Sequence, residues 1–236
     1  MIGVLDLQGD VVEHLDHLDR LGVPNRRIKE AAQLEGMAGL ILPGGESTCL
    51  SRLIRIFEID RGIRLACQQG MKVWGTCAGA ILLATTVIGE APHLALIDME
   101  IERNGFGSQL DSFTREALIP AVSSSPLPLA FIRAPKIHRV GPGVSVLLSL
   151  DDYIAAAESE AVLITVFHPE LTPSLALHRY FAEKCGISAA GTGVESDERI
   201  WTPTSWTRYA RIAPANPFTV PSNVSVEAIP SWLLAL

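Results

Sequence analysis

The sequence predicts an α/β protein whose mostly parallel central sheet is covered by helices on both faces. In the first hundred residues, short β-branched runs alternate with helical patterns, which is typical of such a sheet. Two of the strand patterns run directly into glycine-rich turns, Pro43-Gly44-Gly45 and Gly75-Thr76-Cys77-Ala78-Gly79. The 236 residues are enough for one α/β domain with an appendage.

The helices and strands of the first hundred residues are predicted from the spacing of apolar residues and from the turn residues between them. Residues 2–7 indicate a strand, and 11–21 a helix, because apolar residues recur there at helical spacing and Gly22 supplies a stop. Further strands are expected at 23–28, 39–42 and 71–74. Ser47 or Thr48 is expected to cap the helix after the first glycine turn, and residues 80–85 read as a helix after the second.

Beyond about residue 95 the pattern becomes strand after strand. Strands are predicted at 96–101, 129–133, 144–148, 153–157 and 162–167, and a closing helix at 173–184. Gly186 then ends a core of residues 1–186.

The last fifty residues, 187–236, differ in composition from this core. They hold seven charged residues and no Lys, but five Pro and three of the four Trp. Without a sustained period of 3.6 or 2, the segment is expected to be an irregular or disordered tail, and docking of its aromatic residues is as plausible as plain disorder.

Composition excludes several classes of function. A formal net charge of −7 without clustered Lys or Arg argues against a nucleic-acid or anionic-membrane partner. Neither a membrane span nor a signal peptide is recognisable, so a cytoplasmic protein is expected. Four cysteines without a CxxC pair suggest neither a disulfide framework nor a zinc site, and no metal or other cofactor is expected.

Cys77 is the strongest candidate for chemistry. It lies between two glycines at a strand-to-helix turn, which projects a nucleophile above the carboxyl edge of the sheet. The helix that begins beneath the sulfur favours a thiolate and offers backbone N–H groups to an oxyanion. The other cysteines, Cys49, Cys67 and Cys185, lack this context and are expected to be packing residues.

A base should lie near this thiol, and His168 is the preferred one of six histidines. It ends the apolar strand pattern 161–167, at the same edge of the sheet as Cys77, and Glu170 can return to bond its imidazole. A Cys77–His168–Glu170 triad is therefore predicted. His14 and His17 fall in a helical pattern among acidic residues and are expected on a solvated face, with a metal pair as the lesser alternative.

The turn at 43–48 lacks the Lys-Ser/Thr of a phosphate loop, so we expect it to offer a backbone N–H to an oxyanion and polar groups to a small zwitterion, unless it is merely structural. Taken together, Pro43-Gly44-Gly45-Glu46-Ser47-Thr48, Gly75-Thr76-Cys77-Ala78-Gly79 and His168-Pro169-Glu170 resemble the class I glutamine amidotransferases. More closely, the chain resembles the glutaminase subunits of pyridoxal 5′-phosphate synthase. That match rests on Leu7-Gln8-Gly9-Asp10, Glu102-Arg103-Asn104-Gly105-Phe106-Gly107, Gln109-Leu110-Asp111-Ser112-Phe113, Phe131-Ile132-Arg133-Ala134-Pro135 and His168-Pro169-Glu170-Leu171-Thr172.

The resemblance implies a flavodoxin-like α/β fold with Cys77 as nucleophile and His168 and Glu170 completing the triad. It implies that the glutamine site is lined by Gly45, Glu46, Ser47, Arg103, Ile132 and Arg133. In our interpretation an Arg holds the α-carboxylate, Glu46 meets the α-ammonium, and backbone N–H groups near Gly45 and Ala78 hold the oxyanion.

The resemblance further implies hydrolysis of L-glutamine to glutamate and ammonia, with the ammonia passed to a synthase subunit in a hetero-oligomer for vitamin B6 synthesis. Pyridoxal phosphate is then the product of the pathway and not a cofactor of this chain. Asp6 and Asp10 depart from the expected pattern and are expected to face this partner. The alternatives are an amidotransferase that serves another synthase, and an interaction module that has kept only the fold.

Overall fold

The computed structural model describes residues 1–105 and 112–189. The motif residues Phe106, Gly107 and Gln109 to Asp111 lie outside this range, as does the predicted tail from residue 190 onward. The strands are β1 (Ile2–Leu5), β2 (Asn25–Ile28), β3 (Gly39–Leu42), β4 (Lys72–Thr76), β5 (Ala84–Val87), β6 (Ile97–Glu102), β7 (Phe113–Ala117), β8 (Leu127–Phe131), β9 (Lys136–Val140), β10 (Ser145–Leu150), β11 (Tyr153–Glu158) and β12 (Val162–Thr165). The helices are α1 (Val11–Arg20), α2 (Ser47–Ile56), α3 (Ile59–Gln68), α4 (Ala78–Leu83) and α5 (Ala176–Lys184), with short 3-10 turns η1 (Ala31–Leu34) and η2 (Pro169–Leu171).

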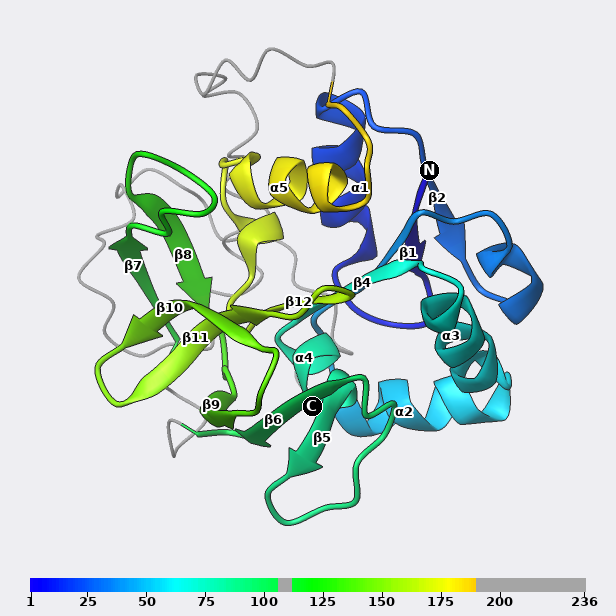
Figure 1. Ribbon diagram of the computed structural model, residues 1–236, viewed down its shortest axis with the longest axis horizontal. Helices are drawn as coiled ribbons and strands as arrows, with labels where there is room; N and C mark the ends of the chain where they lie inside the picture. Colours follow the sequence, from blue (N-terminus) through cyan, green and yellow to red (C-terminus); the bar gives the residue numbers. More distant parts are fainter. Residues whose placement is uncertain (106–111, 190–236) are drawn as a thin grey trace, which may run out of the picture.

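One large sheet runs through the molecule in the order β2-β1-β3-β4-β12-β11-β9-β6-β5, with β10 paired to β11 (Figure 1). Its first five strands are parallel to their neighbours, whereas β11 is antiparallel to β12 and β9 is antiparallel to both β11 and β6. Strands β7 and β8 form a separate antiparallel pair. The predicted α/β class with its parallel core is thus confirmed.

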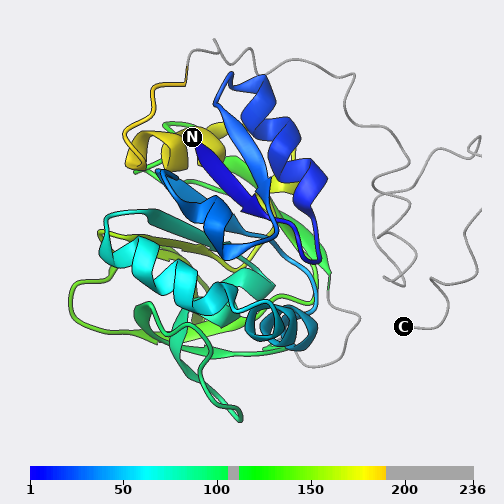
Figure 2. The same cartoon turned by 90° about the vertical axis from the view of Figure 1, so that its right-hand side faces the viewer.

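Helices cover both faces of the parallel half. Helices α1 and α5 pack together on one face, while α2, α3 and α4 lie on the other (Figures 1 and 2). This arrangement explains why β1, β3 and β12 are buried at every residue and read as short continuous apolar runs. No helix of the described residues is long and apolar enough to span a membrane.

Trp74 of β4 lies in the centre of the core. It is fully buried, and its indole Nε1–H donates to Thr165 Oγ1 on the neighbouring β12 at 3.2 Å. Its ring packs edge-on against His14 of α1 and His178 of α5, with centroids 5.7 and 4.9 Å away. Trp74 thereby joins the sheet to both helices of that face.

The sequence expectations for individual elements are partly right. The strand at 39–42 is found as predicted, whereas β5, β7, β9 and α3 were not predicted. Helix α3 follows α2 through Glu58, which has a left-handed backbone (φ 53°) although it is neither Gly nor Asn, so no residue-type signal marks the break. The helix expected at 80–85 begins and ends two residues earlier, because the chain turns into β5 at Ala84.

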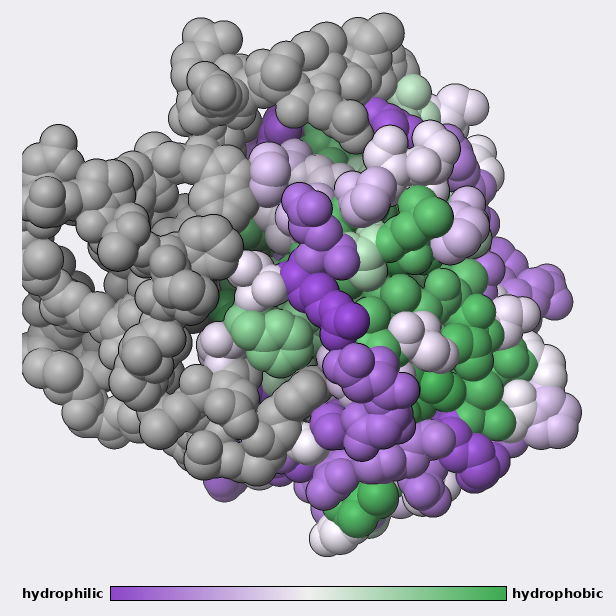
Figure 3. All heavy atoms as spheres, turned by 90° about the vertical axis from the view of Figure 1, so that its left-hand side faces the viewer, coloured by the Kyte–Doolittle hydropathy of each residue, from purple (hydrophilic) through white to green (hydrophobic). Residues whose placement is uncertain are grey.

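The antiparallel end of the molecule exposes some large apolar side chains. Val146 of β10 is 44% exposed and Leu118, just after β7, is 46% exposed. Figure 3 views this end and shows hydrophobic surface beside a band of hydrophilic side chains.

Candidate active site

The carboxyl ends of four parallel strands gather the candidate residues at one edge of the sheet. Asp10 follows β1, Gly44 to Glu46 follow β3, Cys77 follows β4, and His168 follows β12. Strand order reverses at β1 and β3, because the chain goes from β1 outward to β2 and then back to β3. Ligands of open α/β sheets bind in the crevice at such a reversal.

Cys77 occupies the predicted turn between β4 and α4. Its backbone is left-handed (φ 46°, ψ −102°), an unfavourable conformation for a residue with a Cβ, and its N–H donates to Thr165 O of β12 at 2.9 Å. The thiol is nearly buried and lies 3.9 Å from the carbonyl oxygen of Ile132. The strained turn thus presents a single sulfur at the edge of the sheet.

His168 and Glu170 lie beside this sulfur as the sequence predicted. His168 Nδ1 is 2.8 Å from Glu170 Oε1, and Cys77 lies close enough to the imidazole to raise its pKa. Burial acts to lower the pKa of His168, but the Cys77 thiolate and the nearby carboxyl groups outweigh burial and hold this pKa well above its usual range. These contacts favour the imidazolium form of His168.

Gly44 leaves room for the imidazole of His168. A Cβ at position 44 would lie 2.3 Å from Cε1 and 2.8 Å from Nδ1 of this ring. Next to it, a Cβ on Gly45 would meet the side-chain oxygen of Gln8 at 2.4 Å, and the same oxygen accepts from Glu46 N–H at 2.9 Å. The turn after β3 is therefore packed closely against both the base and the β1 loop.

Glu46, and not Ser47 or Thr48, is the N-cap of α2. Its carboxylate accepts from the backbone N–H groups of Thr48 at 3.0 Å and Cys49 at 2.6 Å, so the expected hydroxyl cap is wrong. Arg103 Nη2 also donates to this carboxylate at 3.2 Å. Partial burial acts to raise the pKa of Glu46, but these hydrogen bonds and the Arg103 charge lower it, so Glu46 is held as an anion.

Arg103 is fixed beside the turn after β3 by contacts with several side chains. Besides Glu46, its guanidinium donates to Thr48 Oγ1 at 2.8 Å and lies 3.6 Å from Glu90. Ile132 offers its carbonyl to the Cys77 thiol, and Arg133, with a left-handed φ of 45°, is exposed at the same loop. The described residues show no hydrogen bond or ion pair to Arg133.

Asp10 is a member of the site that sequence reasoning missed. Its Oδ2 lies 3.3 Å from His168 Nδ1, and its side chain is only 12% exposed, while its expected place facing the partner stays a prediction. The rule that singled out Cys77 and His168 could have found it, because Asp10 also follows a parallel strand at the carboxyl edge. Asp6, directly after β1 in the same loop, pairs with Arg27 and Lys29.

His14 and His17 do not lie on a solvated face; that expectation is wrong. Both are buried in the contact between α1 and α5, because the acidic residues of α1 occupy its other faces. His14 Nδ1 is 2.9 Å from His178 Nε2, and His178 Nδ1 is 3.1 Å from His17 Nδ1. We refer to these three residues as the buried histidine chain.

The other three cysteines are free thiols, and one group of potential metal ligands lies in the site. Burial raises the pKa of Cys67 to about 11 and that of Cys185, despite nearby positive charges, to about 12, so both stay thiols, while Cys49 is exposed. Among the described residues, potential metal-binding atoms converge within 4.8 Å at Asp10, His168 and Glu170. His168 and Glu170 already bond each other there, and the absence of a metal or cofactor stays a prediction.

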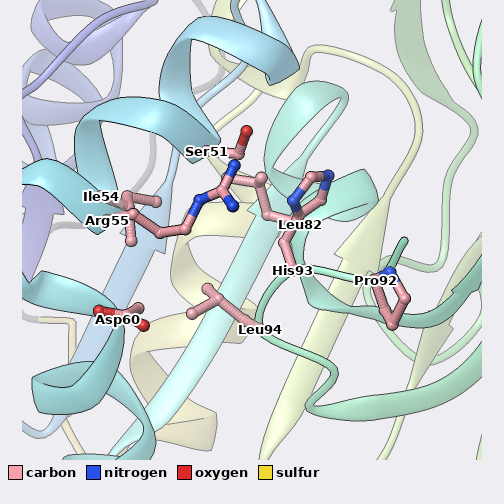
Figure 4. Close-up of a pocket in the computed structure, with 8 residues that line it drawn as sticks. All are labelled: Ser51, Ile54, Arg55, Asp60, Leu82, Pro92, His93 and Leu94. Atoms are coloured by element: carbon pink, nitrogen blue, oxygen red, sulfur yellow. The ribbon is translucent and has the colours of Figure 1, made fainter. Parts of the chain in front are cut away.

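A small pocket lies beside helix α2 (Figure 4). Its lining comes from α2, α3, α4 and the loop before β6, and its polar members are Ser51, Arg55, Asp60 and His93. His93 lies 3.9 Å from Glu90, and Glu90 contacts Arg103, so the pocket adjoins the Arg103 side of the site. None of Cys77, His168 and Glu170 lines it.

Comparisons with known proteins agree with this geometry. Residues 4–187 match the model of the SNO glutamine amidotransferase family. The pyridoxal 5′-phosphate synthase subunit PdxT of Syntrophus aciditrophicus (strain SB) is 63% identical over 211 residues, which is 89% of this chain and 94% of that protein. The subunit of the same name from Ruminiclostridium cellulolyticum is 47% identical over 184 residues, 77% of this chain and 97% of that protein. A crystal structure of a glutamine amidotransferase superposes with a TM-score of 0.75 at 41% identity and covers 79% of this chain and 99% of its own.

Proposed function

Because the chain belongs to the SNO glutamine amidotransferase family, we propose a role for each residue at the carboxyl edge of its sheet. The activity is that of a glutaminase subunit of pyridoxal 5′-phosphate synthase. The chain hydrolyses L-glutamine to L-glutamate and ammonia, and the ammonia passes to a synthase subunit that uses it to make pyridoxal 5′-phosphate. The observation that carries the catalytic assignment is Cys77 in its strained turn beside His168, whose Nδ1 contacts Glu170.

Cys77 is the nucleophile. Its thiolate attacks the side-chain amide carbon of glutamine, and the developing oxyanion is held by the backbone N–H groups of Gly45 and Ala78. His168 donates its Nε2 proton to the leaving ammonia, which leaves a glutamyl thioester on Cys77. The imidazole then takes a proton from water as the water attacks the thioester, and glutamate is released. Glu170 keeps the imidazole oriented through its contact with Nδ1.

Substrate recognition uses the charged side chains around this centre. Arg133, which is exposed, and Arg103 bind the α-carboxylate of glutamine. Glu46 accepts the α-ammonium, because a carboxylate has about four acceptor sites and its helix cap and Arg103 use only three. Ser47, buried at the start of α2, and Ile132 complete the wall of the site.

The partner docks over the mouth of this site in a hetero-oligomer. Ammonia released into bulk water would be protonated and lost as a nucleophile, so the synthase must receive it directly. This chain and the synthase act in the cytoplasm, and neither a nucleic acid nor a membrane is a partner of the complex. These statements extend what the relatives' names say, that they are subunits of pyridoxal 5′-phosphate synthase.

We assign residues 1–186 to the glutaminase domain and 187–236 to an appendage. The alignment with the Syntrophus relative covers 211 residues, so it continues beyond residue 186. Ile187 and Ala189 pack on the core, which makes a truncation after Ala189 preferable to one after Gly186. Glutaminase activity and synthase binding of the truncated and full chains, compared side by side, assign the role of the appendage.

A glutaminase assay with and without the pyridoxal 5′-phosphate synthase subunit tests the function. Glutamate release that rises with the synthase and disappears in Cys77→Ala is expected. Release that is unaffected by Cys77→Ala contradicts the mechanism. If glutamate is released only with a different synthase, the chain serves another amidotransferase reaction. If none is released with any synthase, it is an interaction module.

A further inference from the structure

A line of buried polar side chains continues the triad into the core. Glu170 Oε2 is buried and has no hydrogen-bond partner among the described residues. The nearest basic atom is His14 Nε2 at 3.5 Å, which also lies 3.4 Å from Thr76 Oγ1. From His14 the buried histidine chain continues through His178 to His17. At its far end His17 bonds to the backbone of Thr172.

The ends of this line fix how many protons it needs. A backbone carbonyl only accepts, and so does a carboxylate. A hydrogen bond between Glu170 Oε2 and His14 Nε2, which lie 3.5 Å apart, would satisfy this buried oxygen. With that bond, the four contacts from Glu170 through the three histidines to Thr172 need four protons, but three neutral imidazoles carry only three. The fourth proton either makes one histidine an imidazolium or belongs to Glu170 itself.

The surroundings disfavour an imidazolium. Burial, reinforced by neighbouring histidines, lowers the pKa of His14 to about 3 and that of His178 well below its usual range. Burial and the Arg20 charge lower the pKa of His17 to about 4, against the hydrogen bond to Thr172. Burial also raises the pKa of Glu170, although the charge of His168 opposes it. The carboxyl group is the better place for the fourth proton.

A second carboxyl group can carry the negative charge beside His168. Asp10 Oδ2 lies 3.3 Å from His168 Nδ1, while Glu170 Oε1 lies 2.8 Å from the same nitrogen. Two carboxylates this close repel each other, so one of them is favoured to keep a proton. Asp10 is 12% exposed and sits at the N-terminus of α1, where solvent and the helix dipole favour an anion, whereas the Glu170 side chain is fully buried.

We propose that Glu170 is a neutral acid in the resting enzyme, with its Oε2–H donated to His14, and that Asp10 is the carboxylate facing the His168 imidazolium. The proposal rests on the proposed function for its meaning in catalysis. Glu170 Oε1 still accepts from His168 Nδ1–H, so Glu170 orients the base without balancing its charge. His14 and Asp10 then act as positioning residues for the triad.

The proton positions can be read directly by NMR on the full chain labelled with ¹⁵N-histidine. Two-bond ¹H–¹⁵N spectra at pH 7 are expected to show His14 and His178 as neutral Nδ1–H tautomers and His17 as the neutral Nε2–H tautomer. Single His→Gln variants assign the signals. Glu170→Gln should leave this pattern unchanged, because an amide N–H replaces the carboxyl O–H toward His14. His138→Gln, an exposed histidine paired with Glu102, is the matched control.

An Nε2–H tautomer at His14, or an imidazolium at any of the three histidines, overturns the proposal. So does a reversal of the tautomers in Glu170→Gln. This spectrum needs no activity, so it tests the proposal even if the proposed glutaminase function fails.

Enzyme kinetics in the complex with the synthase provide a second test of the roles proposed for Asp10 and Glu170. Asp10→Asn is expected to lower kcat/KM by about tenfold or more and to move the alkaline limb of the pH profile to lower pH, because the imidazolium loses its counter-charge. Glu170→Gln should lose less than tenfold and leave this limb in place. A larger shift of the limb in Glu170→Gln than in Asp10→Asn contradicts the division of roles.

Discussion

Gly44→Ala tests whether the position of the His168 ring limits catalysis. The backbone at Gly44 is not left-handed, so alanine can adopt it without strain. Its Cβ, however, would lie 2.3 Å from Cε1 and 2.8 Å from Nδ1 of His168. The substitution therefore adds one methyl group directly against the base.

The size of the effect follows from the contact. Carbon atoms pack at about 3.5 Å or more, so the ring or the loop must move by roughly 1 Å. A displacement of this size breaks the 2.8 Å contact with Glu170 and the alignment with Cys77. Misplacing a catalytic group by about 1 Å costs on the order of 100-fold in rate, or about 2.7 kcal/mol in the activation barrier.

The assay is kcat/KM for glutamate release in the complex with the synthase, together with the melting temperature. Gly143→Ala is the matched control: its φ of 79° strains an alanine, but no atom lies within 4 Å of the added Cβ. The control should lose stability and keep its activity, whereas Gly44→Ala should lose activity. If Gly44→Ala keeps more than about a third of wild-type kcat/KM, the packing argument for His168 is refuted.

Three further predictions concern the nucleophile, the substrate and acid stability. Cys77→Ala should abolish glutamate release while Cys49→Ala, at an exposed thiol, keeps it; equal activity of the two variants would rule Cys77 out as nucleophile. Arg103→Gln should raise KM about tenfold, since a charge-assisted hydrogen bond is worth roughly 1.5–3 kcal/mol, whereas Arg139→Gln, at a surface pair with Asp98, should not change KM. Because the pKa of His14 is about 3 in the folded chain and near 6.5 when unfolded, the unfolded state binds more protons below pH 6.5, and stability falls as pH drops toward 3. Urea titrations should show this slope reduced by about 1.4 kcal/mol per pH unit in His14→Gln, and an unchanged slope would contradict a neutral buried His14.

Local sequence patterns were sufficient to predict the site residues that follow parallel strands. Cys77 and His168 each end an apolar run, and the carboxyl ends of parallel strands share one edge, so their proximity follows from the topology. The bounds of strand β3 were also predicted to the residue, because glycines mark both of its ends. What the pattern could not give is the distance or the partner of each side chain.

The site features that the sequence did not predict correctly have physical causes. His14 and His17 lie on α1 among acidic residues, and only the packing of α5 against that helix shows which face is buried. Glu46 can replace a hydroxyl cap because its longer side chain folds back on Thr48 and Cys49, a conformation that capping statistics do not favour. Asp10 also follows a strand of the parallel sheet, but the prediction for this residue rested on its charge and not on that position.

Trp74 makes the core of this protein observable by fluorescence. The other three tryptophans all lie beyond residue 200, so a chain truncated after Ala189 contains a single indole. That indole touches His14 and His178, and a protonated imidazole quenches indole emission on contact. Emission from the truncated chain therefore reports when a proton enters the buried histidine chain, in real time and without any label.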